Sequence, residues 1–432
     1  SRKPHPSARE VWHQYQSVWT TDKDAENGVV EVYNEYDFRD IENYRLEWTI
    51  TADGVKKLSG AVEELNIPPH MRQYVELGYT KSDIAALEGE VILTVRYILK
   101  SNEALLGSGH CAAYNQIVLR EYNAAEQFEK CKSAVSGSLT VDRDNRVVRG
   151  ADFEVKFSGK GALDSYKLAG KELISKPLMP LFYRAMTEND YGVRKNGTNS
   201  VYYHSWKTFR NIEWYMDLFM MEQKADKVEV VSRYTYGEIG MAVTVAYTID
   251  AEGRVAIKES MTPGRAKLDI RAMLRYGVEL AMPDSFCNIE FYGAGGTESY
   301  ADRKSGTPIG VYQQSVSDQF CMTYSRPQES GAHCDLRYWT ITDGTGCGFK
   351  VVSNILFSAT AIPYPMEQID VLSESYRKYP QLLEGDGNTY INIDMAQSGL
   401  VCRNSWGAIP MEQYRIPYQA HEFEFMLIPV GR

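Results

Sequence analysis

Two stretches of this sequence crowd charged and polar side chains together, and the first of them lacks a clean helical or strand period. The first is FYRAMTENDYG at 182–192, and the second is NIEFYGAGGTESYADR at 288–303. Charged groups packed this closely must pair with one another, cap backbone groups or face a ligand. We favour a buried polar network that fixes the geometry of loops over direct contact with a ligand. The candidate residues are Arg184, Glu188, Asn189, Asp190, Glu298, Tyr300, Asp302 and Arg303.

A third candidate is the tryptophan in CRNSWGAIP at 402–410. Asn404, Ser405 and Gly407 surround it, and this composition is typical of a loop rather than a strand. Tryptophan is usually buried because its ring carries a large apolar area. A loop that carries Trp406 is therefore a candidate site, and the question is what the ring contacts.

Motifs for other chemistries are incomplete. GAGGTE at 293–298 is similar to a dinucleotide loop, but Glu298 stands at the last glycine position and no helical pattern follows. EGDGNTY at 384–390 is similar to a calcium loop, but Gln397 stands where the bidentate glutamate belongs. There is no G-x-S-x-G serine motif, and the seven histidines lack ligand spacing. The sequence thus predicts neither a metal site nor a cofactor in this chain.

The elements that must position these residues are strands. Apolar and polar residues alternate with period two in YRLEWTIT (44–51), VILTVRYIL (91–99), MAVTVAYTI (241–249) and HEFEFMLIP (421–429). Half-buried antiparallel strands produce this alternation. Helical periodicity is nearly absent, and we expect short helices only within 206–221 and 366–378. The sequence therefore predicts an all-β fold.

The strand-like runs divide into a short and a long series. Residues 1–120 hold about as many runs as one immunoglobulin-like sandwich. Residues 121–138 are polar and poorly periodic, so we expect a linker there. Residues 139–432 continue without a further boundary, and an all-β sandwich can reach this size as one domain. We therefore predict a small sandwich, a linker and one very large antiparallel sandwich.

Composition narrows the class of protein. The 432 residues are 44% hydrophobic and 24% charged, as in soluble globular proteins. The net charge of −10 and the lack of a basic run argue against a nucleic-acid partner, and the short apolar runs argue against a membrane span. An odd count of seven cysteines without C-x-x-C favours free thiols. The start SRKPHPS without an initiator Met suggests part of a longer polypeptide, whose compartment stays open between cytoplasm and periplasm.

Several segments together resemble the C-terminal region of the large bacterial β-galactosidases of glycoside hydrolase family 2. The resemblance rests on five runs, whose order and spacing extend over nearly the whole chain. They are PHPSAREVWHQYQSVW with EYDF and SGHCAAYNQ (within 4–116), GALDSYKLAGKELISKPLMPLFYRAMTENDYG (161–192), YGAGGTESYADRKSG (292–306), YSRPQESGAHCDLRYWT (324–340) and YINIDMAQSGLVCRNSWGA (390–408).

The resemblance implies an immunoglobulin-like domain followed by a super-sandwich related to galactose mutarotases. In that family the loops of the super-sandwich close over the mouth of a (β/α)₈ barrel, and the tryptophan matching Trp406 stacks on the sugar. Asn404 and Ser405 would then belong to the sugar-binding loop. Gly192 matches the start of a loop that moves during turnover, and Arg184, Glu188, Asn189 and Asp190 match its scaffold. An aromatic ring on a loop suits the apolar C–H face of a pyranose.

The sequence departs from the family just before Trp406. The family usually has two glycines and an aspartate there, whereas this chain has Val401, Cys402 and Arg403. Arg403 adds a positive charge near the expected sugar, so the preferred β-galactoside need not be the family's usual one.

The resemblance also implies what this chain lacks. Retaining glycosidases need two carboxyl groups ~5.5 Å apart, and this family carries them on barrel strands with Mg²⁺ and Na⁺ nearby. The chain has no β/α alternation for a barrel. We therefore expect an upstream barrel in the same polypeptide, a homo-oligomeric parent that acts on β-galactosides, and no hydrolysis by this part alone.

Other classes of function stay open. A free-standing carbohydrate-binding module would need only Trp406 and other exposed aromatic rings. A mutarotase-like epimerase would need a general acid and base in one cleft, for which His333 with Glu329 is the candidate pair. A third alternative is a structural role in assembling the oligomer.

Overall fold

Both parts of the chain are built from alternating strands. The computed structural model describes residues 3–132, 137–194, 197–264, 269–370, 379–400, 404 and 406–431. These divide into two compact units, of which the smaller comprises Ser7–Asn123 and Ser305–Val311. The larger comprises Ser1–Pro6, Ala124–Lys304 and Tyr312–Arg432 and carries every candidate site residue.

The smaller unit pairs two antiparallel sheets around one core. One sheet runs in the order β4 (Val55–Val62), β3 (Tyr44–Ala52), β6 (Val91–Leu99) and β7 (Cys111–Arg120). The other runs β1 (Val18–Asp24), β2 (Val29–Asn34) and β5 (Arg72–Glu76), and the short helices are α1 (Ser7–Gln14), η1 (Ala25–Asn27) and α2 (Lys81–Ala85). Val30 and Val32 of one sheet share a hydrophobic cluster with Leu46 and Leu93 of the other. The immunoglobulin-like assignment of this unit stays a prediction.

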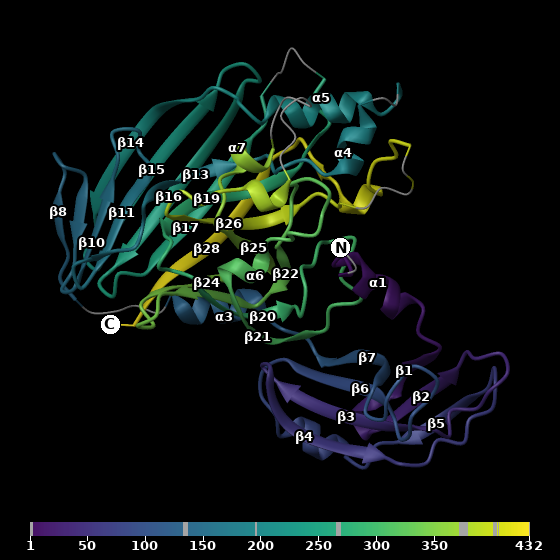
Figure 1. The fold of residues 1–432 in the computed structure, drawn as a ribbon. Helices are drawn as coiled ribbons and strands as arrows, with labels where there is room; N and C mark the ends of the chain where they lie inside the picture. The colour runs from purple at the N-terminus through teal and green to yellow at the C-terminus, as the bar shows by residue number, and fades with distance from the viewer. Residues whose placement is uncertain are drawn as a thin grey trace. The chain divides into compact units, whose positions relative to one another are not determined.

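The larger unit is a sandwich of two long antiparallel sheets (Figure 1). The first has the order β14 (Tyr215–Gln223), β15 (Lys227–Tyr236), β16 (Met241–Asp250), β17 (Val255–Thr262), β28 (His421–Val430), β24 (Gly348–Ser353), β23 (Tyr338–Thr342), β20 (Asn288–Ala294) and β21 (Ile309–Ser315). Of β21, residues 312–315 belong to this unit. The second has the order β22 (His333–Leu336), β25 (Phe357–Ile362), β26 (Asn388–Gln397), β19 (Arg275–Pro283), β13 (Lys176–Leu181), β11 (Leu163–Leu168), β10 (Phe153–Phe157), β9 (Val147–Arg149) and β8 (Thr140–Asp142). β12 (Lys171–Glu172) pairs with β11, and β18 (Ala272–Met273) pairs with β27 (Ile416–Pro417).

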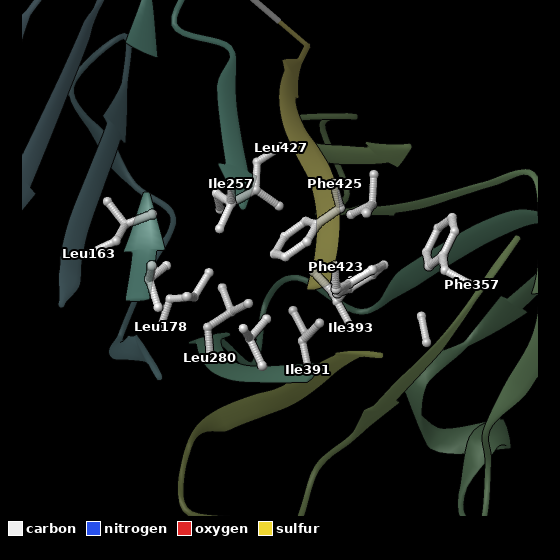
Figure 2. Packing of buried hydrophobic residues seen from close by; sticks show 14 of the residues in the cluster. Leu163, Leu178, Ile257, Leu280, Phe357, Ile391, Ile393, Phe423, Phe425 and Leu427 are labelled. Carbon is white, nitrogen blue, oxygen red and sulfur yellow. The ribbon is translucent and has the colours of Figure 1, made fainter. Parts of the chain in front are cut away.

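The core lies between these two sheets, as Figure 2 shows. Ile257, Phe425 and Leu427 project from the first sheet, and Leu280 and Ile391 from the second, into one cluster. Their burial follows from strand alternation, because every second residue points to the same face. The predicted all-β fold is confirmed, and the alternating runs within β3, β6, β16 and β28 are strands.

The helices differ from what the sequence predicts. Within 206–221 only the end of α5 (Ser200–Thr208) is helical, 209–214 are turn and irregular chain, and 215–221 lie in strand β14. Within 366–378 the helix is α7 (Met366–Ile369), and 371–378 lie outside the described residues. The remaining short elements are α4 (Glu188–Val193), α6 (Val316–Gln319), η3 (Pro380–Leu382) and η4 (Glu412–Tyr414).

The segment predicted as a linker contains a packed helix, α3 (Ala124–Cys131). Its Phe128 is fully buried against Val352 of β24 and Met426 of β28. Phe128, with the half-buried Cys131 one turn on, therefore fixes α3 on a sheet, and so few apolar residues leave little periodic trace in the sequence.

Candidate functional site

Trp406 lies on a turn and is 83% exposed, whereas Trp206 and Trp339 are buried. The backbone N–H of Trp406 donates to Oδ1 of Asn404 at 2.9 Å, so Asn404 shapes the turn from within. Gly407 follows with φ +81°, a conformation that glycine adopts without a steric penalty. Ser405 and the departing residues Val401, Cys402 and Arg403 lie outside the described residues. The turn therefore presents the indole ring outward.

Predicted scaffold residues hold the chain that leads into this turn. The N–H of Leu400 donates to Oδ1 of Asp302 at 3.1 Å, and Nδ2 of Asn189 donates to the carbonyl of Leu400 at 3.2 Å. Nη2 of Arg184 donates to the carbonyl of Gly399 at 3.4 Å. A Cβ on Gly399 would lie 2.4 Å from Oδ2 of Asp302, so a larger residue there would displace the Asp302 side chain. Residues from both charged stretches thus meet at 399–400.

The chain that leaves the turn is held by a residue that the sequence did not single out. Nδ2 of Asn199, just before α5, donates to the carbonyl of Gly407 at 3.0 Å. Gly192 lies in α4, and a Cβ there would be 3.8 Å from the nitrogen of Gly407. Figure 1 shows the same neighbours: the yellow chain that precedes β28 passes beside α4. An asparagine before a helix is so common that it gave no signal in the sequence.

Arg184 and Asp190 form a buried ion pair beneath the turn. Nη1 of Arg184 lies 2.7 Å from Oδ2 of Asp190, and the two residues are 0% and 1% exposed. Asp190 also accepts from the N–H and hydroxyl of Thr187, at 2.8 and 3.0 Å, which caps α4. Burial alone would lower the pKa of Arg184, but the carboxyl groups of Asp190 and Glu329 raise it. Arg184 therefore keeps its charge, and the capping contacts of Asp190 fix where α4 begins.

Glu188 lies at the surface of the same helix. Its carboxylate pairs with Nε of Arg326 at 2.7 Å, and its backbone N–H donates to Oε1 of Gln328 at 3.1 Å. The guanidinium of Arg326 lies 4.1 Å from the ring centroid of Tyr191. Glu188 thus ties α4 to the 326–328 loop.

The second charged stretch forms its own buried network. Glu298 accepts from the N–H of Gly331 at 2.7 Å and from the hydroxyl of Tyr324 at 3.2 Å, and it pairs with Arg303. Burial lowers the pKa of Arg303, whereas the charge of Glu298 raises it. On balance the pKa lies above its usual value. The hydroxyl of Tyr300 donates to Glu329 at 3.4 Å. These contacts link the 298–303 and 324–331 segments.

Arg275 of β19 extends this network into the sheet. It lies 3.4 Å from Oε1 of Glu329 and 3.2 Å from Oδ2 of Asp394, and all three residues are buried. Burial raises the pKa of Asp394 to about 7, against the opposing charge of Arg275. Each candidate of the two charged stretches therefore has a protein partner, as expected of a network that fixes loops.

The candidate acid–base pair for an epimerase is buried. His333 is 2% exposed, and its ring stacks on Phe291 with the centroids 4.2 Å apart. Burial lowers the pKa of His333 to about 4. Glu329 is 8% exposed and is held by Arg275 and Tyr300. This pair gives the epimerase alternative no support.

Within the described ranges, no group of three or more His, Cys, Asp or Glu side chains could hold a metal ion. The six cysteines that lie there are free thiols, and Cys402 falls outside. None of the helices in the same ranges is both long and apolar enough to cross a membrane.

Comparison with known proteins agrees with the resemblance. Residues 149–427 match the family described as Beta galactosidase small chain, and residues 30–120 match Beta-galactosidase, domain 4. A β-galactosidase of Priestia megaterium is 26% identical over 95% of this chain and 38% of its own length. One of Halalkalibacterium halodurans is 27% identical over 96% of this chain and 39% of its own length. The chain thus spans about two fifths of these relatives.

Among solved structures, galactose 1-epimerase from Lactobacillus acidophilus NCFM aligns with a TM-score of 0.35 and 9% identity. The alignment covers 69% of this chain and 99% of that one. The family match covers well over half of the chain, from β9 to β28. The chain belongs to the β-galactosidase small-chain family.

Proposed function

We propose that this chain is the sugar-capping part of a retaining β-galactosidase of glycoside hydrolase family 2. In this proposal Trp406 stacks on the galactosyl ring, and Asn404 and Ser405 shape the turn that presents it. The observation that carries the proposal is an 83% exposed tryptophan on a turn whose flanks are bonded to Arg184, Asn189, Asp302 and Asn199. Anchored flanks limit the freedom that an aromatic ring loses when it binds a sugar.

The chemistry would come from another part of the same polypeptide. The relatives named β-galactosidase are more than twice as long as the stretch they share with this chain. We infer that a barrel in the additional length supplies the nucleophile and the acid/base carboxyl group, together with bound Mg²⁺ and Na⁺. The chain alone then does not hydrolyse β-galactosides, and the parent protein assembles as a homo-oligomer. The hinge role of Gly192 belongs to the same proposal.

Hydrolysis of o-nitrophenyl β-galactoside by this chain, beside the full product of its gene, tests the proposal. We expect activity from the full product and none from the chain. Activity in the chain would place a catalytic carboxyl pair within residues 1–432 and overturn the division of roles.

Trp406→Ala in the full product is expected to lower kcat/KM for o-nitrophenyl β-galactoside ~10- to ~100-fold. The loss follows from removing one aromatic–sugar contact worth ~1.5–3 kcal/mol. Trp406→Phe keeps an apolar ring and should retain most of the activity. Tyr379→Ala is the control, because Tyr379 is another exposed aromatic residue of this unit, at 67%. A kcat/KM unchanged in Trp406→Ala would refute the stacking role.

A free-standing carbohydrate-binding module is the second candidate. The same exposed Trp406 supports it, because a ring on an anchored turn can bind a sugar without catalysis. The two candidates differ in one result: a module binds galactosides as the isolated chain, whereas a capping loop needs its barrel.

A further inference from the structure

A polar groove of about 620 Å³ lies on the larger unit, at residues that take no part in the Trp406 turn. Its floor is formed by β20 and β23, and its wall by the end of β21 and the start of α6. Ligand sites in proteins commonly enclose about 300–1,000 Å³, so the groove is large enough for a ligand of several rings.

Strand register places the floor side chains. Ile289 and Ile341 point into the core, so Asn288, Glu290 and Thr340 lie on the opposite face of the sheet. The cross-strand pairs are Asn288 with Thr342 and Glu290 with Thr340. The floor is thus an ordered ladder of amide, hydroxyl and carboxylate groups rather than a random polar surface.

Neighbouring groups hold these side chains in place. The two oxygens of Glu290 accept separate bonds, from the hydroxyl of Tyr338 at 3.1 Å and from Nε2 of Gln313 at 2.8 Å. Nδ2 of Asn288 donates to the carbonyl of Asp343 at 3.0 Å, and Oε1 of Gln314 accepts from Gln319. Polar groups that are already oriented lose little entropy when they bind a ligand.

The donors and acceptors of the groove lining that are not used within the described part of the protein suit a ligand rich in hydroxyl groups. Among the described residues, nothing bonds the amide oxygen of Gln313 or the amide N–H groups of Gln314, and the threonines carry hydroxyls that both donate and accept. Lysine, arginine and histidine are absent from the described lining, and its carboxylates repel anions. Aromatic rings are also absent from that lining, so an apolar ligand gains little there. A neutral, hydroxyl-rich ligand satisfies all of these conditions.

We propose that this groove is a second glycan site, which binds a neutral oligosaccharide or polysaccharide strand. Glu290, Asn288 and Thr340 form the floor that hydrogen-bonds the sugar hydroxyls, and Gln313 and Gln314 close over one side. The site does not require Trp406, and it would tether this protein to a polymeric glycan independently of the sugar at the turn.

Affinity electrophoresis of the chain in native gels tests the proposal, with soluble galactan, arabinogalactan or glucomannan cast into the gel. We expect retardation in at least one of them, and at least a fivefold weaker apparent affinity for the double variant Gln313→Ala/Thr340→Val. Valine is a good strand former, so Thr340→Val removes a hydroxyl without disturbing β23. Ser260→Ala is the matched control. Ser260 lies on β17, on the same outer face of the same sheet as the groove floor, but it does not line the groove. Melting curves verify that every variant is folded.

Trp406→Ala separates this site from the turn. Retardation that persists in Trp406→Ala and weakens in Gln313→Ala/Thr340→Val supports the groove. Retardation lost in Trp406→Ala and kept in the double variant overturns it and leaves the turn as the binding site. Unretarded migration of the wild-type chain in all three gels also overturns the groove, without bearing on the stacking role of Trp406 in the full product.

Discussion

Arg184→Met is expected to lower the free energy of unfolding of this chain by ~3–5 kcal/mol. The substitution leaves the carboxylate of Asp190, 1% exposed, without the guanidinium that neutralises it. Removing one partner of a buried ion pair costs this much because the remaining charge stays in a poorly polarisable interior. The carbonyl of Gly399 loses its donor as well, so the chain leading to Trp406 is loosened. Urea unfolding at pH 7 measures the change.

Arg233→Met is the matched control. Arg233 also pairs with an aspartate, Asp217, at 2.8 Å, but its side chain is 48% exposed on the solvent face of β15. Water solvates both groups when the pair is broken, so the unfolding midpoint should hardly move. Equal shifts in the two variants would contradict a special role for the buried pair.

The sequence predicts the strands well because alternation is a local property. β3 and β16 each bury every second residue, as their patterns require. β14 does not bury every second residue, because its pairing with β15 shifts register between Met216 and Leu218. The apolar run at 218–221 follows this irregularity and does not alternate with polar residues, so the sequence resembles a helix face there.

The candidate site is predictable only in part. Charged groups crowded into a short stretch indicate a network, since such groups need partners wherever they are buried. The partners themselves are distant: Arg275, Glu329 and Asp394 come from β19, a loop and β26. The order of strands in a sheet brings them together, and no local pattern records that order. Asn199 adds a second reason: an asparagine before a helix is common, and its bond to Gly407 joins residues that lie far apart in the sequence.

Glu259→Gln is expected to reduce the pH dependence of stability, because Glu259 is buried without a partner. It points into the core from β17, is 0% exposed, and neither carboxyl oxygen has a hydrogen-bond partner within the described ranges. Burial, and secondarily the charge of Asp394, raises the pKa of Glu259 well above its usual value near 4.5. The folded chain therefore keeps a proton that the unfolded chain releases as pH rises through that value.

The free energy of unfolding falls as pH rises, because the buried carboxyl group of Glu259 is stable only in its protonated form. The stabilising contribution of protonated Glu259 is fully present below about pH 4.5 and is lost as pH rises towards the folded pKa. Each retained proton lowers the free energy of unfolding by ~1.4 kcal/mol per pH unit in that window. Asp394, whose pKa is about 7, contributes in the same direction, so the wild-type slope falls in Glu259→Gln without vanishing.

Glu259→Met should go further and raise the free energy of unfolding at pH 8 by ~1–3 kcal/mol. Methionine fills a similar volume, and it removes a carboxyl group whose burial without hydrogen bonds costs about that much. Urea unfolding of wild type, Glu259→Gln and Glu259→Met between pH 5 and pH 8 measures both effects. Glu222→Gln, at the exposed end of β14, should keep the wild-type slope. If wild type and Glu259→Gln had the same slope, Glu259 would ionise normally in the fold, and the carboxyl group would have to be hydrated there.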